Sequence, residues 1–296
     1  MEQPLVSIII PTYKRPDTLD RAINSVLNQT YKNIEVIVVD DNNPDTEGRR
    51  LTIEKMKEFE NNPLVKYIMQ PQNMNGSVAR NTGARVSKGE YIGFLDDDDE
   101  FLPGKIESQL KRFSEVPEEY AVCYSRYYTI KPGGERHLAS ETREGNQYLN
   151  ALTRELSFQA GSNMLIKRKA FEDIHGFDET FVRSQDKEIV ARLLKKYRIC
   201  CCQTPGLVAY LHYNHNGFDP IKITDYYEEK MKAYIDELSP EDRAYYNRGM
   251  ANQRFYYSFS RKRYGYAMKI LFSGKLPICD AWNILLKGFV SKYFKK

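Results

Sequence analysis

Short apolar runs alternate with amphipathic segments through the first hundred residues of the chain. The apolar runs have the length of strands and lie at 5–10, 34–39, 64–69 and 91–95. Residues 45–60 and 77–87 carry apolar positions at helical spacing, and the segment that begins at Pro16 places five on one face: Leu19, Ala22, Ile23, Val26 and Leu27. Strands that are apolar along their whole length, separated by helices, are typical of a parallel sheet covered on both faces. The pattern therefore predicts an α/β fold, with a mostly parallel sheet flanked by helices.

The alternation loosens beyond residue 100. We expect a helix near 104–115, strands near 120–130, 162–167 and 205–210, and a helix over 186–197 with one apolar face. From about residue 222 the chain is rich in tyrosine and helical in pattern. These features predict an α/β domain over 1–220 and a helical C-terminal region over 221–296.

The composition is that of an ordinary globular protein, with 41% hydrophobic and 28% charged residues. No apolar stretch approaches the ~20 residues that are needed to cross a bilayer. The first apolar run is short and no basic segment precedes it, so it indicates a buried strand and not a signal peptide. We therefore expect a cytoplasmic protein.

The five cysteines include no C-x-x-C pair, the spacing that zinc sites and redox motifs usually need. Three of them are consecutive, at 200–202, and follow Ile199. We interpret these three as small hydrophobic residues of a buried strand.

The net charge of +4 conceals an asymmetry. Residues 243–296 contain twelve Lys or Arg and one acid, Asp280, whereas the rest of the chain has 32 basic and 39 acidic residues. The C-terminal segment also carries apolar residues at helical spacing: Trp282, Leu285, Leu286, Phe289, Val290 and Tyr293. Such a stretch either packs on the rest of the protein or lies on an anionic membrane, and the charge asymmetry favours peripheral membrane contact.

A polar cluster follows each of the first four predicted strands. The clusters lie at 11–15, 40–43, 73–76 and 96–99. Ligands of parallel α/β sheets bind at the carboxyl ends of the strands, near the point where the strand order reverses. We therefore expect the four clusters to meet at one edge of the sheet.

The fourth cluster consists of four consecutive aspartates, Asp96 to Asp99. Carboxylates placed so close together repel one another and raise each other's pKa unless a cation lies among them. Carboxylate oxygens are the ligands that Mg²⁺ and Mn²⁺ prefer. The alternative is a solvated acidic loop, but its position after a buried strand favours a Mn²⁺ or Mg²⁺ site.

Four ordered motifs together resemble those of the inverting family 2 glycosyltransferases, which have the GT-A fold. The motifs are Pro-Thr-Tyr-Lys-Arg at 11–15, Val-Asp-Asp-Asn at 39–42, Asn-Met-Asn-Gly-Ser-Val-Ala-Arg-Asn-Thr-Gly at 73–83 and the segment 89–99 that ends in the aspartates. The resemblance covers roughly residues 5–215. It implies a GT-A catalytic domain that uses a nucleotide-sugar, and hence an enzyme that transfers a sugar.

The resemblance also assigns roles to positions of this chain. It places the base and ribose of the nucleotide against one loop: Pro11, Thr12, Tyr13 and Arg15. Asp41 would accept a hydrogen bond from uracil, which implies a UDP-sugar, and Arg80 would meet the ribose or the diphosphate. Asp96 or Asp97 would contact the ribose, Asp98 would coordinate the metal, and Asp99 would be structural. Each side chain also has an ordinary alternative, such as packing for Tyr13 or a surface ion pair for Arg15.

Inversion requires a base that deprotonates the acceptor hydroxyl. In the family this base is the Asp of a Glu-Asp pair that opens a helix after a Gly-Phe-Asp segment. Here Gly-Phe-Asp lies at 176–178, Asp186 takes the base position, and Gln185 replaces the usual Glu. The alternative is that Asp186 only complements the helix N-terminus. Glu188 would lie ~200° around the helix and could not easily substitute.

Two histidines follow the last predicted strand, His212 and His215. Enzymes of this fold often place a late histidine on the metal or the diphosphate, and we assign His212 to the metal. A hydrogen-bonded surface histidine is the alternative.

The expected partners are a UDP-sugar donor and a saccharide or lipid-linked acceptor, as in bacterial surface polysaccharide synthesis. A nucleotidyltransferase also joins a nucleotide-binding sheet to acidic metal ligands, but its first strand is usually followed by a Gly-rich basic loop, unlike residues 11–13. A nucleic-acid-binding protein would use the basic, Tyr-rich tail. The acidic remainder of the chain argues against a broad phosphate footprint, so we expect no nucleic acid partner.

Overall fold

The structure is a computed structural model that describes residues 3–212, 219–274 and 276–282. The chain forms two compact units, one of residues 1–151 and 156–214 and the other of residues 152–155 and 215–296. Helix α5 (Tyr148–Leu152) ends one residue inside the second unit. Within the described residues, no helix is both long and apolar enough to span a membrane.

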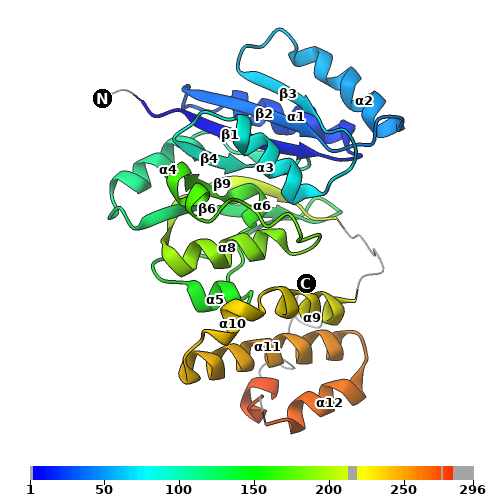
Figure 1. Ribbon diagram of the computed structural model, residues 1–296, viewed down its shortest axis with the longest axis vertical. Helices are drawn as coiled ribbons and strands as arrows, with labels where there is room; N and C mark the ends of the chain where they lie inside the picture. The colour runs from blue at the N-terminus through cyan, green and yellow to red at the C-terminus, as the bar shows by residue number, and fades with distance from the viewer. Residues whose placement is uncertain (1–2, 213–218, 275, 283–296) are drawn as a thin grey trace. The chain divides into compact units, whose positions relative to one another are not determined.

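A nine-stranded sheet lies at the centre of the first unit (Figure 1). Its strand order is β3-β2-β1-β4-β8-β6-β9-β5, and β7 pairs with β6. The strands are β1 (Val6–Thr12), β2 (Ile34–Asp40), β3 (Val65–Met69), β4 (Tyr91–Phe94), β5 (Glu100–Phe101), β6 (Tyr120–Ile130), β7 (Arg136–Leu138), β8 (Leu165–Lys167) and β9 (Arg198–Tyr210). Only the short β5, β7 and β8 run antiparallel to their neighbours. The predicted mostly parallel sheet is confirmed.

Helices cover both faces of this sheet. From β1 through β2 to β3 the chain moves outward, and right-handed connections place α1 (Pro16–Leu27) and α2 (Glu47–Met56) on one face, where they contact each other. The return from β3 to β4 reverses direction, so α3 (Gly76–Val86) packs on the other face, against β1 and β2. The reversal lies between β1 and β4, and this is the point at which a ligand site is expected.

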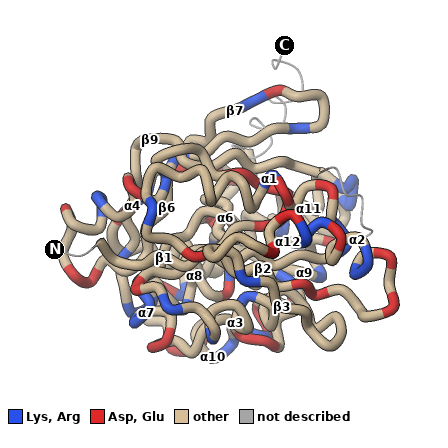
Figure 2. Tube along the Cα trace, turned by 90° about the horizontal axis from the view of Figure 1, so that it is seen from above, with Lys and Arg blue, Asp and Glu red and all other residues tan. Residues whose placement is uncertain are grey.

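The remaining helices of the first unit flank the second half of the sheet. Helix α4 (Lys105–Ser114) packs against β6 and β9, and α7 (Arg168–Asp173) against β8 and β4. The one-turn α6 (Ala160–Asn163) contacts α8 (Gln185–Lys196) and the ends of β4 and β9. A short 3-10 helix (Lys57–Phe59) extends α2. Acidic and basic residues are interspersed along α2 and α7 (Figure 2), as on solvated helix surfaces.

Local sequence explains where the helices begin. Helix α1 starts with Pro16, whose fixed φ suits the first helical position. Helix α2 follows Thr46, whose hydroxyl accepts the backbone N–H of Arg49. Helix α3 follows Asn75, which has a φ of 80° and whose side-chain oxygen accepts the N–H groups of Ser77 and Val78. These caps fix the loops that lie at the carboxyl ends of β1, β2 and β3.

Two details differ from the sequence-based expectations. Within the run 64–69, the strand β3 is partly exposed, with Met69 at 52%, because β3 lies at the edge of the sheet that the described residues form. The strand expected over 162–167 begins only at Leu165, since residues 160–163 form the helical turn α6. The three consecutive cysteines are buried in β9, as interpreted from their neighbours.

The second unit is helical in its described part. Its helices are α9 (Pro220–Lys230), α10 (Lys232–Asp236), α11 (Pro240–Ser260) and α12 (Tyr264–Phe272). A small core of Ala251, Phe255, Ala267, Leu276 and Ala281 joins α11, α12 and the segment after them. Of the apolar C-terminal residues singled out from the sequence, only Trp282 lies among the described residues.

Candidate active site

The loop after β1 and the turn after β4 are tied together by side-chain hydrogen bonds. Thr12 Oγ1 donates to Asp97 Oδ2 at 2.8 Å, and the backbone N–H of Tyr13 donates to the same oxygen at 3.3 Å. Arg15 Nη1 lies 3.2 Å from Asp97 Oδ1 and 2.5 Å from Asp98 Oδ2. The structure therefore brings together two of the polar clusters found in the sequence.

The side chains of two further residues of the predicted nucleotide loop, Pro11 and Tyr13, take no part in these hydrogen bonds. Pro11 is a half-buried residue of β1. The Tyr13 side chain is exposed, and Lys14 Nζ lies 4.9 Å from the centre of its ring. An exposed ring beside the loop offers a flat apolar surface without being part of the core.

Asp41 joins the same edge from the end of β2. Its backbone N–H donates to the Thr12 carbonyl at 2.9 Å. Asn73 Nδ2 donates to its Oδ2 at 2.9 Å, and the Met74 N–H donates to its Oδ1 at 2.8 Å. Burial raises the pKa of Asp41 to about 6, although the backbone N–H groups that it accepts oppose the shift. The Asn75 N–H also contributes to lowering that pKa, so three protein donors face a carboxylate that has about four acceptor sites, and it can accept another hydrogen bond.

A buried ion pair fixes the backbone beside Asp41. Arg49 Nε lies 3.0 Å from Asp40 Oδ2, which also accepts the Tyr67 hydroxyl at 2.6 Å. The Arg49 guanidinium further donates to the Asn42 carbonyl. A buried carboxylate is tolerated because it is paired and hydrogen-bonded in this way. Asp40 therefore has a structural role, whereas the neighbouring Asp41 is available to a ligand.

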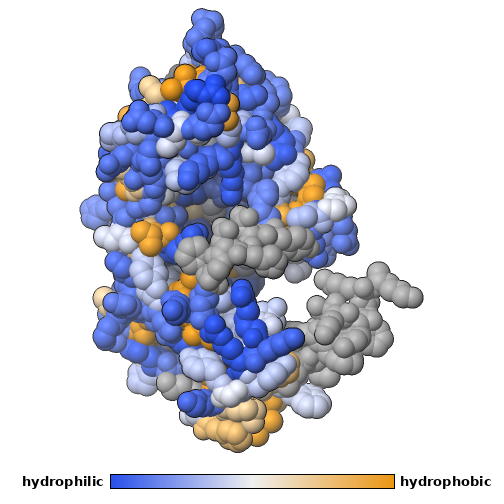
Figure 3. Space-filling model, turned by 90° about the vertical axis from the view of Figure 1, so that its right-hand side faces the viewer, coloured by the Kyte–Doolittle hydropathy of each residue, from blue (hydrophilic) through white to orange (hydrophobic). Residues whose placement is uncertain are grey.

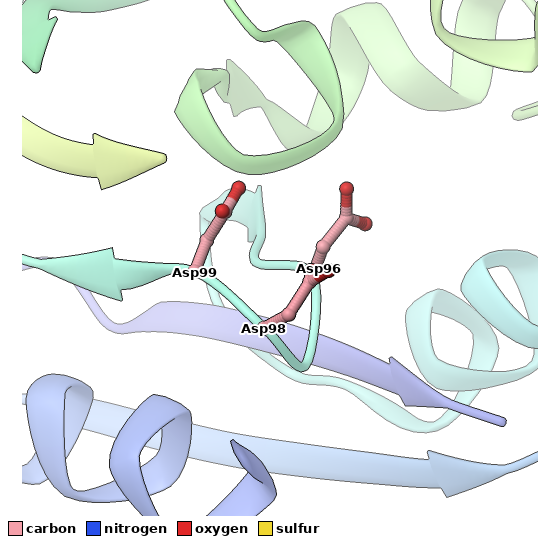
Figure 4. Close-up of side chains that lie close together, drawn as sticks. All are labelled: Asp96, Asp98 and Asp99. Carbon is pink, nitrogen blue, oxygen red and sulfur yellow. The ribbon is translucent and has the colours of Figure 1, made fainter. Parts of the chain in front are cut away.

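The turn after β4 groups three of the four consecutive aspartates. The carboxylates of Asp96, Asp98 and Asp99 offer oxygen atoms that all lie within 4.8 Å of one another (Figure 4). Helix α6 lies against this group, because the Asp96 N–H donates to Ser162 Oγ at 3.1 Å. A Cβ on Gly161 would come within 2.8 Å of Asp96 Oδ2, so a side chain there would displace the Asp96 carboxylate.

The fourth aspartate, Asp97, turns toward the β1 loop through its contacts with Thr12 and Arg15. Burial raises the pKa of Asp97 to about 7, while those two contacts lower it. Burial also raises the pKa of Asp99 to about 8, and the charge of Asp96 adds to that shift. Both pKa values are raised mainly because the carboxylates are buried, and neighbouring aspartates add to the shift, so ionising this group carries a cost in free energy.

Two basic side chains lie against this acidic turn. Arg80 Nη2 lies 2.5 Å from Asp96 Oδ1, and His212 Nε2 lies 2.9 Å from Asp98 Oδ2. His212 therefore contacts the aspartate that was assigned to the metal. His215 lies outside the described residues.

The chemistry of the carboxylate group fits a divalent cation. Three aspartates supply only oxygen atoms, which suit Mn²⁺ or Mg²⁺. A bound cation would offset the burial and the charge of Asp96, the two largest effects that raise the pKa of Asp99. From the sequence, Asp99 was expected to be structural, whereas the structure groups its carboxylate with those of Asp96 and Asp98.

Arg21 is a site residue that the sequence analysis missed. It projects from α1, and its Nη2 donates to the backbone carbonyl of Asp98 at 2.6 Å. Its guanidinium also lies 3.9 Å from the centre of the Tyr210 ring, at the end of β9. The Tyr210 N–H in turn donates to Asp99 Oδ1 at 3.0 Å. An arginine on an amphipathic helix gave no signal of these contacts, because its partners lie at least 77 residues away.

A buried lysine supports α6 from within the first unit. Lys105 is 1% exposed, and its Nζ lies 2.5 Å from Asn163 Oδ1 and 3.2 Å from Ser125 Oγ. No carboxylate accepts from it among the described residues. Burial lowers the pKa of Lys105 to about 7. Asn163 directly follows Ser162, so this amine helps to fix the turn that contacts Asp96.

Asp186 is the second residue of α8, as the sequence predicted. Among the residues that the structure describes, its carboxylate has no hydrogen-bonding or ion-pair partner, and it is half-buried. The neighbouring Gln185 Nε2 donates to the Phe181 carbonyl at 3.0 Å. A Cβ on Gly76 would come within 3.3 Å of Gln185 Oε1 and 2.8 Å of Arg80 Nη1. The start of α8 therefore lies beside the start of α3, whose Arg80 contacts the acidic turn.

Glu188, two residues further along α8, has a different environment. It is 1% exposed and forms an ion pair with Arg192. The Arg192 guanidinium also donates to the Ile174 and Gly176 carbonyls. Glu188 therefore holds the preceding loop in place and is not available as a base.

Comparison with known proteins agrees with this geometry. The model of a family described as "Glycosyl transferase family 2" matches residues 7–175. An uncharacterized glycosyltransferase of Rickettsia typhi is 32% identical over 244 residues, which cover 81% of this chain and 74% of the relative. The amylovoran biosynthesis glycosyltransferase AmsB of Erwinia amylovora is 27% identical over 200 residues, or 63% of this chain and 62% of AmsB. The chain spans only 34–39% of the length of the relatives from Rickettsia bellii, Rickettsia felis and Rickettsia conorii.

Solved structures show the same fold. Staphylococcus aureus TarS 1–349 superposes with a TM-score of 0.65 at 19% identity, covering 87% of this chain and 73% of TarS 1–349. The crystal structure of TarS 1–349 in complex with UDP-GlcNAc gives the same TM-score at 18% identity, covering 86% of this chain and 73% of that one. At such low identity the likeness establishes the arrangement of strands and helices.

Proposed function

The chain belongs to glycosyl transferase family 2 and has the GT-A fold, and from this premise we propose that it transfers a sugar from a UDP-sugar, with inversion at the anomeric carbon. One observation carries the proposal. The β1 loop is tied to the carboxylate group after β4 through Thr12 and Arg15, with Asp41 bonded to the same loop. A nucleotide loop and metal-type carboxylates at one sheet edge suit a nucleoside diphosphate.

Asp41 would recognise the base of the donor. Its carboxylate is positioned by Asn73 and by the backbone of Met74 and Asn75, and it keeps the capacity to accept one more hydrogen bond. Uracil presents an N3–H donor, which an ionised carboxylate binds more strongly than a neutral acceptor does. Tyr13, exposed beside the loop, would lie against the base or ribose. Asp97, already held by Thr12, would face the ribose.

The diphosphate would lie over the acidic turn. Asp98, with Asp96 and Asp99 grouped beside it, would hold Mn²⁺ or Mg²⁺, and His212 would be a further ligand. When bound, such a cation neutralises the charge that develops on the UDP leaving group. Arg80 contacts Asp96 and would meet the phosphate oxygens from the start of α3.

Asp186 would act as the general base. It is a carboxylate without a protein partner among the described residues, at the start of a helix that lies beside Arg80 and the donor site. The acceptor hydroxyl would lose its proton to Asp186 while its oxygen bonds to the anomeric carbon. The bond from that carbon to the UDP oxygen would break on the opposite side of the sugar, which inverts the configuration.

The acceptor we propose is a saccharide or a lipid-linked saccharide of bacterial surface polysaccharide synthesis. The amylovoran biosynthesis enzyme among the relatives supports this class of acceptor. The excess positive charge of residues 243–296 supports a location at the inner face of an anionic membrane. We assign catalysis to a domain over 1–220 and place the basic helical region over 221–296.

The decisive test replaces Asp186 with Asn. The protein is first incubated with a panel of UDP-sugars and Mn²⁺, and release of UDP identifies the donor. We then expect Asp186→Asn to lower the transfer rate by about 10²–10⁴-fold, because the base is lost, while UDP affinity changes by less than about twofold.

Asp17→Asn is the matched control, because Asp17 is exposed and is the second residue of α1, as Asp186 is of α8. Both substitutions remove a carboxylate that complements a helix N-terminus. Only Asp186→Asn should abolish transfer. Wild-type transfer by Asp186→Asn would refute the assignment of the base, and absence of UDP binding by the unmodified protein would refute the donor.

A further inference from the structure

Helix α12 of the second unit exposes an apolar stripe. Tyr264, Met268 and Phe272 are spaced four residues apart, so they lie along one side of the helix, and they are 52%, 44% and 79% exposed. The side that packs against α11 is centred on Ala267, and of the three stripe residues Tyr264 also lies against a residue of α11, Phe259. Met268 and Phe272 are not part of the core that joins the described helices.

Phe259 adjoins this stripe, and further exposed apolar residues lie in the same C-terminal segment. The Phe259 ring, at the end of α11, lies 5.2 Å from that of Tyr264 in an edge arrangement. Ile278 and Trp282, again four residues apart, are 77% and 62% exposed. We call these residues the aromatic surface: Tyr256, Phe259, Tyr264, Met268, Phe272, Ile278 and Trp282. Figure 3 shows apolar residues at the lower end of the second unit, the height at which α12 lies in Figure 1.

Unpaired cations accompany the aromatic surface. Arg261 and Lys262 lie in the turn between α11 and α12, and Lys269 follows Met268. All three are exposed, and within the described part of the chain none has an acidic partner. The only acid from residue 243 onward, Asp280, is already paired with Arg248. Within the described residues from 243 onward, the chain therefore combines exposed aromatic rings with positive charge and carries no acid other than the paired Asp280.

We propose that the aromatic surface docks on an anionic lipid bilayer. Tyrosine, tryptophan and phenylalanine rings are favoured at the boundary between headgroups and acyl chains. Each Lys or Arg near a bilayer that contains anionic lipid adds attraction, which salt screens. The docking itself does not depend on the proposed function. Only its role rests on that function: it would keep the enzyme where a lipid-linked acceptor lies.

A second copy of the chain is a poorer partner for the same surface. A two-fold dimer through this surface would bring Arg261, Lys262 and Lys269 of both copies into one interface. Like charges facing each other disfavour such a contact, and the surface has no free acid to offset them. An anionic bilayer offers negatively charged headgroups for the cations and an apolar interior for the aromatic rings.

Vesicle flotation of the full-length protein tests the proposal. We expect binding to vesicles of phosphatidylcholine with about 30% phosphatidylglycerol, little binding to pure phosphatidylcholine, and weaker binding at higher salt. Lys262→Glu with Lys269→Glu should lower the partition coefficient at least about tenfold. Met268→Ser with Phe272→Ser should lower it by about the same factor, because buried apolar area is lost.

Two matched variants of the first unit serve as controls. Lys66 is an exposed cation of β3 and Ile53 an exposed apolar residue of α2, so Lys66→Glu and Ile53→Ser should leave the partition coefficient within about twofold. Failure of the unmodified protein to bind anionic vesicles would overturn the proposal. So would a dimer in sedimentation analysis that Met268→Ser with Phe272→Ser dissociates, because the surface would then be covered by a second copy.

Turnover with a soluble saccharide acceptor separates this proposal from the enzymatic one. The aromatic-surface variants should lose vesicle binding and retain turnover. Vesicle binding without any UDP-sugar turnover would refute the proposed function and leave the docking surface standing. Turnover without vesicle binding by the unmodified protein would refute the docking surface alone.

Discussion

Lowering the pH from 7 to 5 should weaken the binding of uridine, because Asp41 must be ionised to accept the N3–H of uracil most strongly. Burial raises the pKa of Asp41 to about 6. The ionised fraction is then about 0.9 at pH 7 and about 0.1 at pH 5, and the affinity should fall about tenfold between them. The sign follows from the raised pKa, since protonation begins well above the usual range of an aspartate.

Uridine is the ligand of choice for this measurement, because it carries no phosphate that titrates in the same range. Its dissociation constant should be measured by NMR titration without metal at pH 5, 6, 7 and 8. Asp41→Asn should weaken binding at pH 7 by about 10- to 100-fold, the usual worth of a hydrogen bond to a charged group, and should remove most of the pH dependence. Asp45→Asn, at an exposed aspartate of the same loop, should keep both the affinity at pH 7 and its dependence on pH. A flat affinity between pH 5 and 7 in the unmodified protein would refute the reasoning.

Three further substitutions have defined outcomes. Asp98→Ala should abolish the increase in UDP affinity that Mn²⁺ gives, measured by calorimetry with and without the ion, because it removes the central carboxylate of the group. Arg21→Ala should raise the KM for the donor about tenfold with a smaller effect on kcat in steady-state assays, since it releases the Asp98 carbonyl and the Tyr210 ring. Burial lowers the pKa of Lys105 to about 7, so the unfolded chain binds more protons above that pH and the free energy of unfolding should rise by about 2 kcal/mol from pH 7 to 9. Urea titrations should show no such rise for Lys105→Met. An equal rise in the variant would contradict the assignment of the effect to Lys105.

The first four strands and their helices follow from local pattern. Each apolar run is long enough for a strand, and the polar residues after it stop the strand and begin a loop. Because the carboxyl ends of parallel strands share an edge, the meeting of Thr12, Asp41 and the acidic turn could be expected without coordinates. Such regularity made this half of the unit predictable.

The parts that escaped prediction depend on contacts between distant segments. Helix α6 has four residues, too few for a periodic signal, and it is held by Lys105 and Ser125 through Asn163. Arg21 sits on an ordinary amphipathic helix, and only the fold brings it to Asp98. Asp99 appeared redundant in a run of four acids, because the direction of each side chain depends on the turn's backbone. The sequence alone does not carry these directions.

The cations around the acidic turn explain how the site can exist before its ligands arrive. Arg80 pairs with Asp96, while Arg15 and His212 contact Asp98, so two of the grouped carboxylates have positive partners. Asp99 has none of these partners, and its pKa is raised to about 8. A divalent cation among the carboxylates would compete with Arg15 and Arg80 for the same oxygen atoms. Both guanidinium groups would then be available to the donor diphosphate, so binding of the cation and binding of the nucleotide should each favour the other by the same factor.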